Sequence, residues 1–288
     1  MKKDDVQRYY PYPEGLTSYD QIIPDSHRRR WKTGSWTDDT DMMLAIADAI
    51  LEDKTINKST IARNFKRWFK GCPLGIGRNT YNVLFFSDYE DNPEKAAYIV
   101  WKLSGMKSAA NGAVMRTSII GLWNQDVDKY AEDVCRLTHA DPRCVASCVI
   151  VCQIIHNIVW KRTLLSPNEI IEIANKYDER IATYIDLAFN SHDIASLRLD
   201  EEPYIGYTLK TLSAGLWALY HAQSFKDGLL AVVNAGGDAD TNGAVACSLL
   251  GAKFGFSSIP DYYVDNLIGK ERLKKLSEEF CLLLTQND

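Results

Sequence analysis

The chain has 288 residues, 46% of them hydrophobic and 25% charged, which provides enough apolar material for one large core or two small ones. Its formal net charge of −5 at pH 7 gives no basic field for nucleic acid, and the run Arg28-Arg29-Arg30 is only three residues long. We therefore expect one domain whose main partner is not nucleic acid.

The sequence also lacks the signals of export and membrane insertion. Residues 1–5 contain no apolar segment of the secretory kind, and no apolar run approaches the length of a membrane span. The seven cysteines form no Cys-x-x-Cys pair, and Cys144, Cys148 and Cys152 recur every four residues, like small hydrophobic residues on one helix face. We expect a cytoplasmic protein with no membrane partner and with these thiols in its core.

Residues 1–33 are polar and predict an N-terminal arm or lead-in loop, followed by a helical domain over residues 34–288. The stretch Tyr9-Tyr10-Pro11-Tyr12-Pro13 favours extended chain, because proline restricts its own backbone and that of the residue before it. We expect this region to lead into the first helix of the domain.

An acidic turn begins that helix. The segment Trp36-Thr37-Asp38-Asp39-Thr40-Asp41 is followed by apolar residues at helical spacing, which predict a helix over residues 39–53. Thr37, Asp38 and Asp39 then lie at the helix N-terminus, where hydroxyl and carboxylate groups are common caps. Capping alone is therefore the alternative to a ligand-binding role for this turn.

The next helix is predicted over residues 61–69, and it ends at Gly71-Cys72-Pro73. The loop Gly75-Ile76-Gly77-Arg78-Asn79-Thr80 then leads into another helical stretch. Backbone amides around Gly77 could hold a phosphate at the start of that helix. An ordinary turn is the alternative interpretation of this loop.

A helical pattern over residues 93–107 leads into a stretch of small residues that contains Asn111 and Gly112. Small side chains there allow the backbone to approach a ligand, and a helix that begins near Ala113 would direct its amides and dipole at an anion. A contact between packed helices is the alternative. Arg116 could be either a salt-bridge partner or a ligand contact.

His139 lies in Thr138-His139-Ala140-Asp141-Pro142, just before a long apolar helix predicted over about residues 143–159. It could be a structural hydrogen-bonding residue or a ligand contact. Further helical patterns cover residues 167–184, which predict a pair, and residues 208–220, 225–233 and 243–254, with a loop or short helices over 191–203. No sustained alternation of the strand type occurs, so the fold class is all-α.

A second acidic segment, Gly236-Gly237-Asp238-Ala239-Asp240-Thr241, precedes the helical stretch 243–254. Its glycines permit backbone conformations that a side chain would disfavour, so a loop can direct several oxygens at one point. Carboxylate and hydroxyl ligands without a nearby His or Cys suit magnesium, calcium or manganese. Clustered carboxylates repel each other unless a cation or protons neutralise them. The two acidic segments together therefore predict one divalent-cation site.

Four motifs in this order resemble those of the ADP-ribosylglycohydrolase family. They are Gly34-Ser35-Trp36-Thr37-Asp38-Asp39-Thr40, Asn111-Gly112-Ala113-Val114-Met115-Arg116, Thr138-His139-Ala140-Asp141-Pro142 and Gly236-Gly237-Asp238-Ala239-Asp240-Thr241. The resemblance extends from about residue 27 to about residue 255. It implies a single compact multi-helix domain with a dinuclear metal site in a central cleft. We expect the protein to be a monomer.

The resemblance also implies a function and a set of site residues. The expected reaction is metal-dependent hydrolysis of the bond between ADP-ribose and an acceptor, most simply a mono-ADP-ribosylated protein side chain. Two Mg²⁺ ions, or Mn²⁺, would be held by Thr37, Asp38, Asp39, Asp238, Asp240 and Thr241. Asp38, Asp39 and Asp238 would be catalytic. ADP-ribose would contact Asn111, Gly112, His139 and Gly77.

The sequence departs from the family pattern at its N-terminal end. Family members usually carry a Gly-Asp-x-x-Gly segment and a catalytic acid on the first helix, and no such segment occurs here. Glu14, which lies 24 positions before Asp38, is a poor match for that acid. Two alternatives therefore stay open: a non-catalytic homologue that binds ADP-ribose, and a hydrolase of a related nucleoside adduct.

Overall fold

The computed structural model describes residues 1–11, 14–26 and 28–286. Within these ranges the chain forms fifteen α-helices and no strand apart from an isolated bridge between Ala110 and Tyr207, which confirms the all-α class. The α-helices are α1 (Lys3–Tyr9), α2 (Asp38–Asp53), α3 (Lys58–Lys70), α4 (Arg78–Leu84), α5 (Pro93–Leu103), α6 (Val114–Thr117), α7 (Val127–Arg136), α8 (Pro142–His156), α9 (Pro167–Asn175), α10 (Arg180–Asn190), α11 (Thr208–His221), α12 (Phe225–Asn234), α13 (Ala239–Phe254), α14 (Asp261–Asp265) and α15 (Lys270–Gln286).

Short helical turns supplement them. They are η1 (Tyr19–Gln21), η2 (Arg28–Arg30), η3 (Ser118–Leu122), η4 (Asn157–Lys161), η5 (Ile194–Leu197) and η6 (Phe256–Ser258). Of these, η4 is a π-type turn that continues α8, and the others are 3₁₀ turns. The predicted break over residues 191–203 therefore contains one short helix, η5, between irregular stretches.

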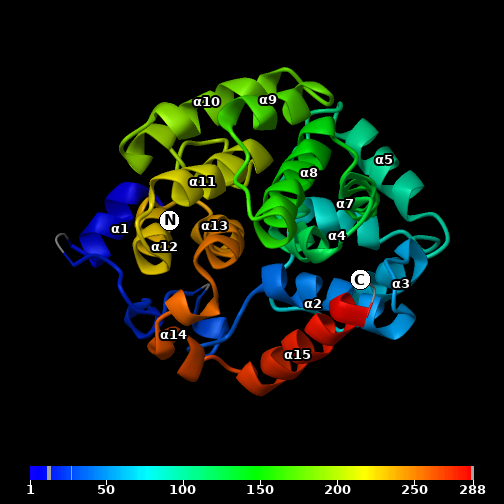
Figure 1. Cartoon of the computed structure of the whole chain (residues 1–288), viewed down its shortest axis with the longest axis horizontal. Coiled ribbons are helices and arrows are strands. Elements are labelled where there is room, and N and C mark those ends of the chain that lie inside the picture. The colour runs from blue at the N-terminus through cyan, green and yellow to red at the C-terminus, as the bar shows by residue number, and fades with distance from the viewer. Residues whose placement is uncertain (12–13, 27, 287–288) are drawn as a thin grey trace.

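Three helices, α8, α11 and α13, lie at the centre of the single domain. Helix α11 packs against both α10 and α13, while α13 also packs against α12, and α8 packs against α7. Figure 1 shows α2 and α15 closing one side of this arrangement, with α9 and α10 on the opposite side. Buried side chains of these helices form one continuous hydrophobic cluster, which includes the fully buried thiols Cys144, Cys148 and Cys152.

Helix α8 is the most apolar segment of the core. Asp141 caps it by accepting a hydrogen bond from the Arg143 backbone N–H at 3.0 Å, and Pro142 occupies its first turn. Contrary to the expectation from sequence, α8 and η4 together, Pro142–Lys161, are long and apolar enough to cross a membrane. In this fold 67% of that stretch is buried, because neighbouring helices surround it. Burial in a core demands the same apolar composition as burial in lipid.

Two predicted helices are shorter than expected. Helix α5 ends at Leu103 instead of near residue 107, because Gly105 and Met106 take left-handed backbone conformations with φ of 69° and 59°. The hydroxyl of Ser104 then accepts hydrogen bonds from the backbone N–H groups of Lys107 and Ser108. The predicted helix after Ala113 is only the single turn α6, and it continues as the 3₁₀ turn η3.

The N-terminal residues lie against the second half of the chain. Met1 exchanges two backbone hydrogen bonds with Gly237, and Leu16 exchanges two with the Asn234 side chain. Helix α1 thereby lies beside α12, as Figure 1 shows. Tyr12 and Pro13, which were expected to be extended, lie outside the described residues, and Tyr9 belongs to α1. The domain boundary at residue 33 stays a prediction.

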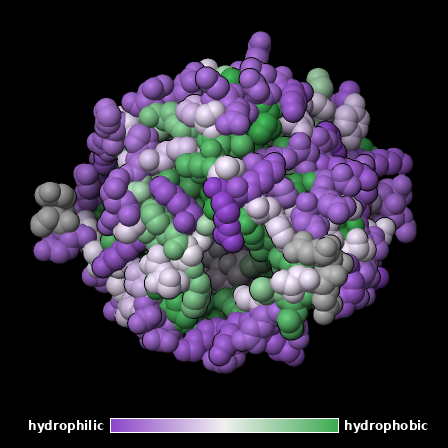
Figure 2. Space-filling view, viewed as in Figure 1, coloured by the Kyte–Doolittle hydropathy of each residue, from purple (hydrophilic) through white to green (hydrophobic). Residues whose placement is uncertain are grey.

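The surface separates polar and apolar groups in the usual way. Figure 2 shows hydrophilic residues over most of one face, and a hollow near its middle whose walls carry hydrophobic residues. The sites of interest lie where helix termini open onto a large cavity.

Candidate functional site

A cavity of about 2040 Å³ is bounded by the N-terminal ends of α2 and α13, by the Gly75–Thr80 loop, and by the chain around Asn111. The residues proposed from sequence that line it are Gly77, Thr37, Asp38, Asn111, Gly112, His139, Asp238, Asp240 and Thr241. Asp39 is the exception, since it is buried behind this wall with 4% of its surface exposed. Residues distant in sequence thus converge on one space.

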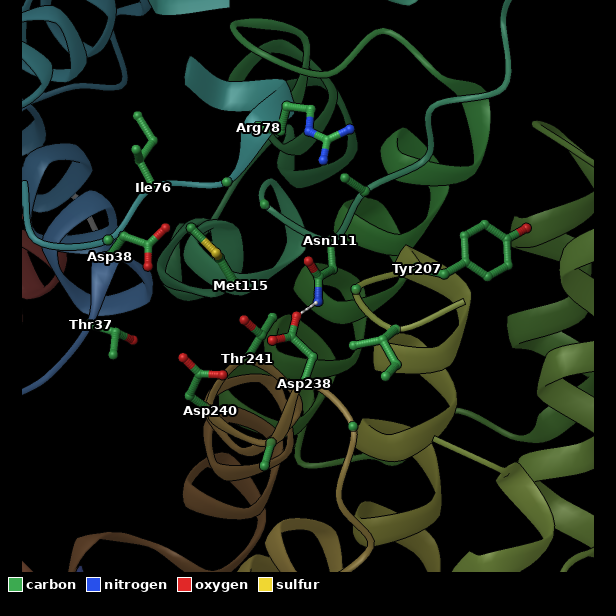
Figure 3. A pocket seen from close by; sticks show the side chains of 18 of the residues that line it. Thr37, Asp38, Ile76, Arg78, Asn111, Met115, Tyr207, Asp238, Asp240 and Thr241 are labelled. Carbon is green, nitrogen blue, oxygen red and sulfur yellow. Dashed lines mark hydrogen bonds between the residues drawn. The ribbon is translucent and has the colours of Figure 1, made fainter. Parts of the chain in front are cut away.

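The two acidic segments face each other across this space. Figure 3 shows Asp38 on one side and Asp238, Asp240 and Thr241 on the other. Asp38 and Asp39 form the first turn of α2, whereas Asp238 immediately precedes α13. The Thr37 hydroxyl donates to Asp39 Oδ2 at 2.7 Å, so that hydroxyl orients the buried carboxylate. Residues of both acidic segments therefore line the same cavity.

Backbone geometry explains the glycine immediately before Asp238. Gly237 has a φ of 72°, in the left-handed region, and a Cβ there would lie 2.3 Å from the carbonyl oxygen of Leu199. Its backbone also exchanges hydrogen bonds with Met1. A side chain at Gly237 would displace the loop and, with it, the Asp238 carboxylate.

Burial and mutual repulsion dominate the electrostatics of the carboxylates. Burial raises the pKa of Asp39 to about 7, and the charge of Asp240 adds to the effect. Burial followed by Asp240 likewise raises the pKa of Asp238 to about 6. The pKa of Asp38 is raised in the same direction by burial and, to a smaller extent, by Asp240. The four carboxylates therefore share one electrostatic environment that favours a cation.

The donor chemistry fits a hard divalent ion. All six residues assigned to metal binding offer carboxylate or hydroxyl oxygens, and Asp39 Oδ1 is buried without a hydrogen-bond partner. Within the part of the chain that the structure describes, no three His, Cys, Asp or Glu side chains converge closely enough to form a preassembled metal cluster. The segments therefore supply a suitable donor set around a cavity, and the metal assignment stays a prediction.

Asn111 is tied into the same wall. Its side-chain amide donates to Asp238 Oδ2 at 2.7 Å and to Thr211 Oγ1 at 3.0 Å, and its backbone N–H donates to the carbonyl of Gly206. The Thr211 hydroxyl in turn donates to Asn242 Oδ1 at 2.8 Å. Asn111 therefore positions a carboxylate of α13, which is a role that the sequence alone did not indicate.

His139 is fully enclosed beside Gly112. The Thr138 hydroxyl lies 2.7 Å from Nδ1 of the ring, and it accepts a hydrogen bond from the Arg116 guanidinium at 2.6 Å. Arg116 has no exposed surface and also donates to the carbonyl of Gly112 at 2.8 Å. Among the described residues it has no carboxylate partner, and it does not line the cavity, so it is neither the salt-bridge residue nor the ligand contact considered from sequence.

The loop before α4 also borders the cavity. Gly77 precedes the seven-residue helix α4, and a Cβ at Gly77 would meet open space. Figure 3 shows Arg78 projecting from the start of this helix, above Asn111 in that view. A phosphate-binding role for Gly77 stays a prediction, with an exposed guanidinium as its neighbour.

Sequence reasoning missed an aromatic and basic part of the cavity wall. Tyr207 packs edge-on against Tyr184, with ring centroids 5.7 Å apart, and lies near Tyr204. The Arg143 guanidinium stands over the Tyr207 ring and donates to its hydroxyl at 3.1 Å. These residues and Arg180 line the cavity. No local sequence pattern connects them, since they lie on α8, on α10 and in the chain before α11.

The acid considered from sequence is not part of the cavity. Glu14 is exposed and does not line it. Among the described residues, the carboxylates that line the cavity are those of Asp38, Asp238 and Asp240. No additional acid of the expected N-terminal kind is therefore found there within the described chain.

Comparisons with known proteins agree with this arrangement. The family model described as ADP-ribosylglycohydrolase matches residues 1–288, which is more of the chain than the four motifs span. An ADP-ribosylarginine hydrolase, Tri1, of Serratia proteamaculans is 24% identical over 90% of this chain and 70% of its own. An ADP-ribosyl-[dinitrogen reductase] glycohydrolase of Rhodospirillum rubrum is 28% identical over 83% of this chain and 75% of its own. A solved structure described as an ADP-ribosylglycohydrolase-related protein complex shares the fold, with a TM-score of 0.72, 22% identity, and coverage of 95% of this chain and 88% of its own.

Proposed function

Because this chain belongs to the ADP-ribosylglycohydrolase family, we propose that it hydrolyses the glycosidic bond that joins ADP-ribose to a mono-ADP-ribosylated protein side chain. The main structural support is the convergence of two oxygen-rich segments, at the starts of α2 and α13, on one large cavity. Two relatives whose names describe hydrolysis of ADP-ribosyl groups support the reaction class. The reaction would release free ADP-ribose and restore the acceptor.

The proposed metal ligands are the six residues of the two acidic segments. Thr37, Asp38 and Asp39 would contribute from α2, with Asp238, Asp240 and Thr241 from α13 and its preceding loop. They would hold two Mg²⁺ ions, or Mn²⁺, as the family resemblance implies, and their oxygens suit either ion. Bound there, they would supply Lewis-acid chemistry to the ribose hydroxyls and to the attacking water.

The protein contributes positioning and charge. Asp38 and Asp238 face the cavity, where their negative charge would stabilise the positive charge that develops on the ribose as the glycosidic bond breaks. Buried Asp39, the next residue in the first turn of α2, would add its negative charge behind Asp38. Asn111 would hold Asp238 in place through its 2.7 Å hydrogen bond.

The remaining residues would bind the ADP-ribose moiety. Gly112 leaves room beside the His139 ring, since a Cβ there would lie 3.2 Å from the ring carbon Cε1. Gly77 and the neighbouring Arg78 offer a backbone loop and a cation to phosphate oxygens. All seven cysteines are free, which supports a reducing cytoplasmic location as part of this proposal.

A non-catalytic protein that binds ADP-ribose is the second candidate. One observation favours it. Glu14 lies outside the cavity, and within the described chain the only carboxylates that line the cavity belong to the two acidic segments. Both candidates predict binding of ADP-ribose, so turnover must separate them.

The deciding experiment measures ADP-ribose release from a panel of mono-ADP-ribosylated substrates in Mg²⁺, Mn²⁺ or EDTA. We expect release that requires metal and that falls by about 100-fold or more in Asp238→Asn, because the substitution removes a cavity charge and a proposed ligand. Asp186→Asn is the matched control, since Asp186 is an exposed carboxylate on α10 that does not line the cavity.

Each outcome has a distinct meaning. Release that is lost in Asp238→Asn and retained in Asp186→Asn supports the hydrolase. ADP-ribose binding without release from any substrate supports the binding protein. Release that persists in EDTA and in Asp238→Asn would remove the proposed role of the two acidic segments.

A further inference from the structure

The His139 ring has one nitrogen with a partner and one without. The side chain is 2% exposed, and its Nε2 atom is buried with no hydrogen-bond partner. The residue nevertheless lines the cavity. A Cβ added at Gly112 would lie 3.4 Å from Nε2 and 3.1 Å from the Thr80 hydroxyl oxygen, so the glycine leaves a small space between these polar groups. An unpaired buried nitrogen is costly in a folded protein, and a ligand that reaches this space would satisfy it.

The partner of Nδ1 determines where the ring carries its proton. Arg116 can only donate, and its Nη2 donates to Thr138 Oγ1 at 2.6 Å. The hydroxyl has one proton of its own, and within the described chain its only acceptor is His139 Nδ1 at 2.7 Å. Nδ1 therefore accepts, and a neutral ring carries its proton on Nε2.

The ring is neutral and the relay is rigid. Burial lowers the pKa of His139 to about 3, and the charge of Arg116 acts in the same direction. Arg116 is itself fixed, because it is fully buried, lies over the Phe65 ring at 4.5 Å, and donates to the Gly112 carbonyl at 2.8 Å. One buried cation thus sets the position of Gly112 and, through Thr138, the orientation of His139.

We propose that Arg116 and Thr138 are positioning residues that hold His139 in its Nε2–H tautomer, so that the ring offers a neutral hydrogen-bond donor to an oxygen of ADP-ribose beside Gly112. The identity of the ligand rests on the proposed function, whereas the tautomer does not. In the opposite tautomer a lone pair of Nε2 would face the ligand, so a phosphate oxygen, which can only accept, would be repelled, and only a ribose hydroxyl could still bind, as the donor. The relay therefore decides which kind of ligand oxygen His139 can hold.

The tautomer is measured first, in the ligand-free protein. Long-range ¹H–¹⁵N spectra of histidine-labelled protein distinguish the two neutral forms, and a His139→Gln variant identifies the His139 signal among the five histidines. We expect the Nε2–H form in the wild type and in Thr138→Ser, which keeps the hydroxyl. Thr138→Val, which has nearly the same volume but no hydroxyl, should lose the fixed tautomer. An Nδ1–H form in the wild type would overturn the proposal without recourse to any variant.

Binding is measured next, by calorimetric titration with ADP-ribose at constant metal concentration. We expect affinity to fall about five- to tenfold in Thr138→Val, the effect of losing one neutral hydrogen bond, and to return in Thr138→Ser. With a hydrolysable substrate the same variants should change KM and leave kcat nearly unchanged, because the contact exists before the reaction. Equal affinities in Thr138→Val and the wild type would overturn the link between tautomer and binding.

The two proposals fail in different ways. A wild-type protein that shows the Nε2–H tautomer but binds no ADP-ribose contradicts the proposed function and the ligand half of this inference, and supports the relay. A wild type that binds and hydrolyses but shows the Nδ1–H tautomer contradicts the relay alone. Near-ultraviolet circular dichroism of Thr138→Val, with Thr138→Ser beside it, shows whether the comparison is made between folded proteins.

Discussion

At the scale of single residues, the chemistry of this site depends on burial more than on residue type. Asp39 and Asp186 are both aspartates on helices, yet Asp39 has only 4% of its surface exposed, whereas Asp186 is exposed. Burial raises the pKa of Asp39 to about 7, and the same effect lowers the pKa of His139 to about 3. Desolvation opposes whichever form carries charge.

The His139 shift predicts a specific acid sensitivity. In the unfolded chain the pKa of histidine is near 6.5, whereas in the folded protein it is about 3. Between these values the unfolded state binds more protons, so the folded state loses stability as pH falls from 6.5 and none on this account above 6.5. One such proton corresponds to a slope of about 1.4 kcal/mol per pH unit.

We expect urea unfolding of the wild type to show this slope between pH 6.5 and 4.5 in excess of that of His139→Gln. The comparison of slopes, instead of absolute stabilities, removes the contribution of the carboxylates that both proteins share. His192→Gln serves as the matched control substitution, because His192 is exposed and does not line the cavity. Parallel curves for the wild type and His139→Gln would show that His139 is not buried in neutral form.

At the scale of elements, close approach of the chain around η3 to α8 explains why the predicted helix after Ala113 is short. A Cβ at Gly121 would lie 2.7 Å from the carbonyl oxygen of Cys152 and 2.8 Å from the Ile155 Cβ. The Thr117 hydroxyl also donates to the Ala113 carbonyl, where the helical pattern tightens into η3. This packing holds the turn that carries Arg116, whose guanidinium donates to the carbonyl of Gly112 in the cavity wall.

Gly121→Ala should therefore destabilise the protein by about 1–3 kcal/mol, since its methyl group meets backbone that cannot move freely. Gly251→Ala on α13 is the matched substitution, because a Cβ there meets nothing within 4 Å, and we expect it to stabilise by roughly 0.5–1 kcal/mol through helix propensity. Chemical denaturation of both variants measures the difference. Equal effects of the two substitutions would contradict the close approach.

At the scale of the whole molecule, the site joins parts of the chain that are far apart in sequence. Asp38 and Asp238 are 200 positions apart (238 minus 38), and the two segments approach because α2 packs against α13 and both helices contact α6. The N-terminal residues add a further connection, since Met1 hydrogen-bonds to Gly237 beside Asp238. A cation bound between the segments would stabilise the fold as well as the reaction.

Mg²⁺ should consequently raise the thermal stability of the folded chain. At a free concentration 100 times its Kd, a ligand that binds only the folded state contributes about 2.7 kcal/mol, or roughly 4–5 °C in Tm for a chain of this size. Differential scanning calorimetry with Mg²⁺ and with EDTA measures the shift. Asp240→Asn should lose most of it and Asp186→Asn should keep it. A full shift in Asp240→Asn would argue against that carboxylate as a ligand.

The sequence by itself determined the helical class, the order of most helices and the residues whose oxygens suit a hard cation. These features depend on local pattern and on residue type, such as the apolar spacing of α2 and the Thr and Asp residues at its start. The expectation that no run is long and apolar enough to span a membrane was wrong for Pro142–Lys161, whose composition does not by itself distinguish burial in protein from burial in lipid.

Only the tertiary structure decided how the site is assembled. Its key contacts join distant parts of the chain. They are the hydrogen bond between Asn111 and Asp238, the hydrogen bonds from Arg116 through Thr138 to His139, and the ring contact between Tyr184 and Tyr207. No sequence spacing encodes these contacts, because each depends on which helix faces pack together and on which groups are thereby removed from water. The same packing sets the pKa of Asp39 and the tautomer of His139, so residue type named the candidates and burial determined what they can do.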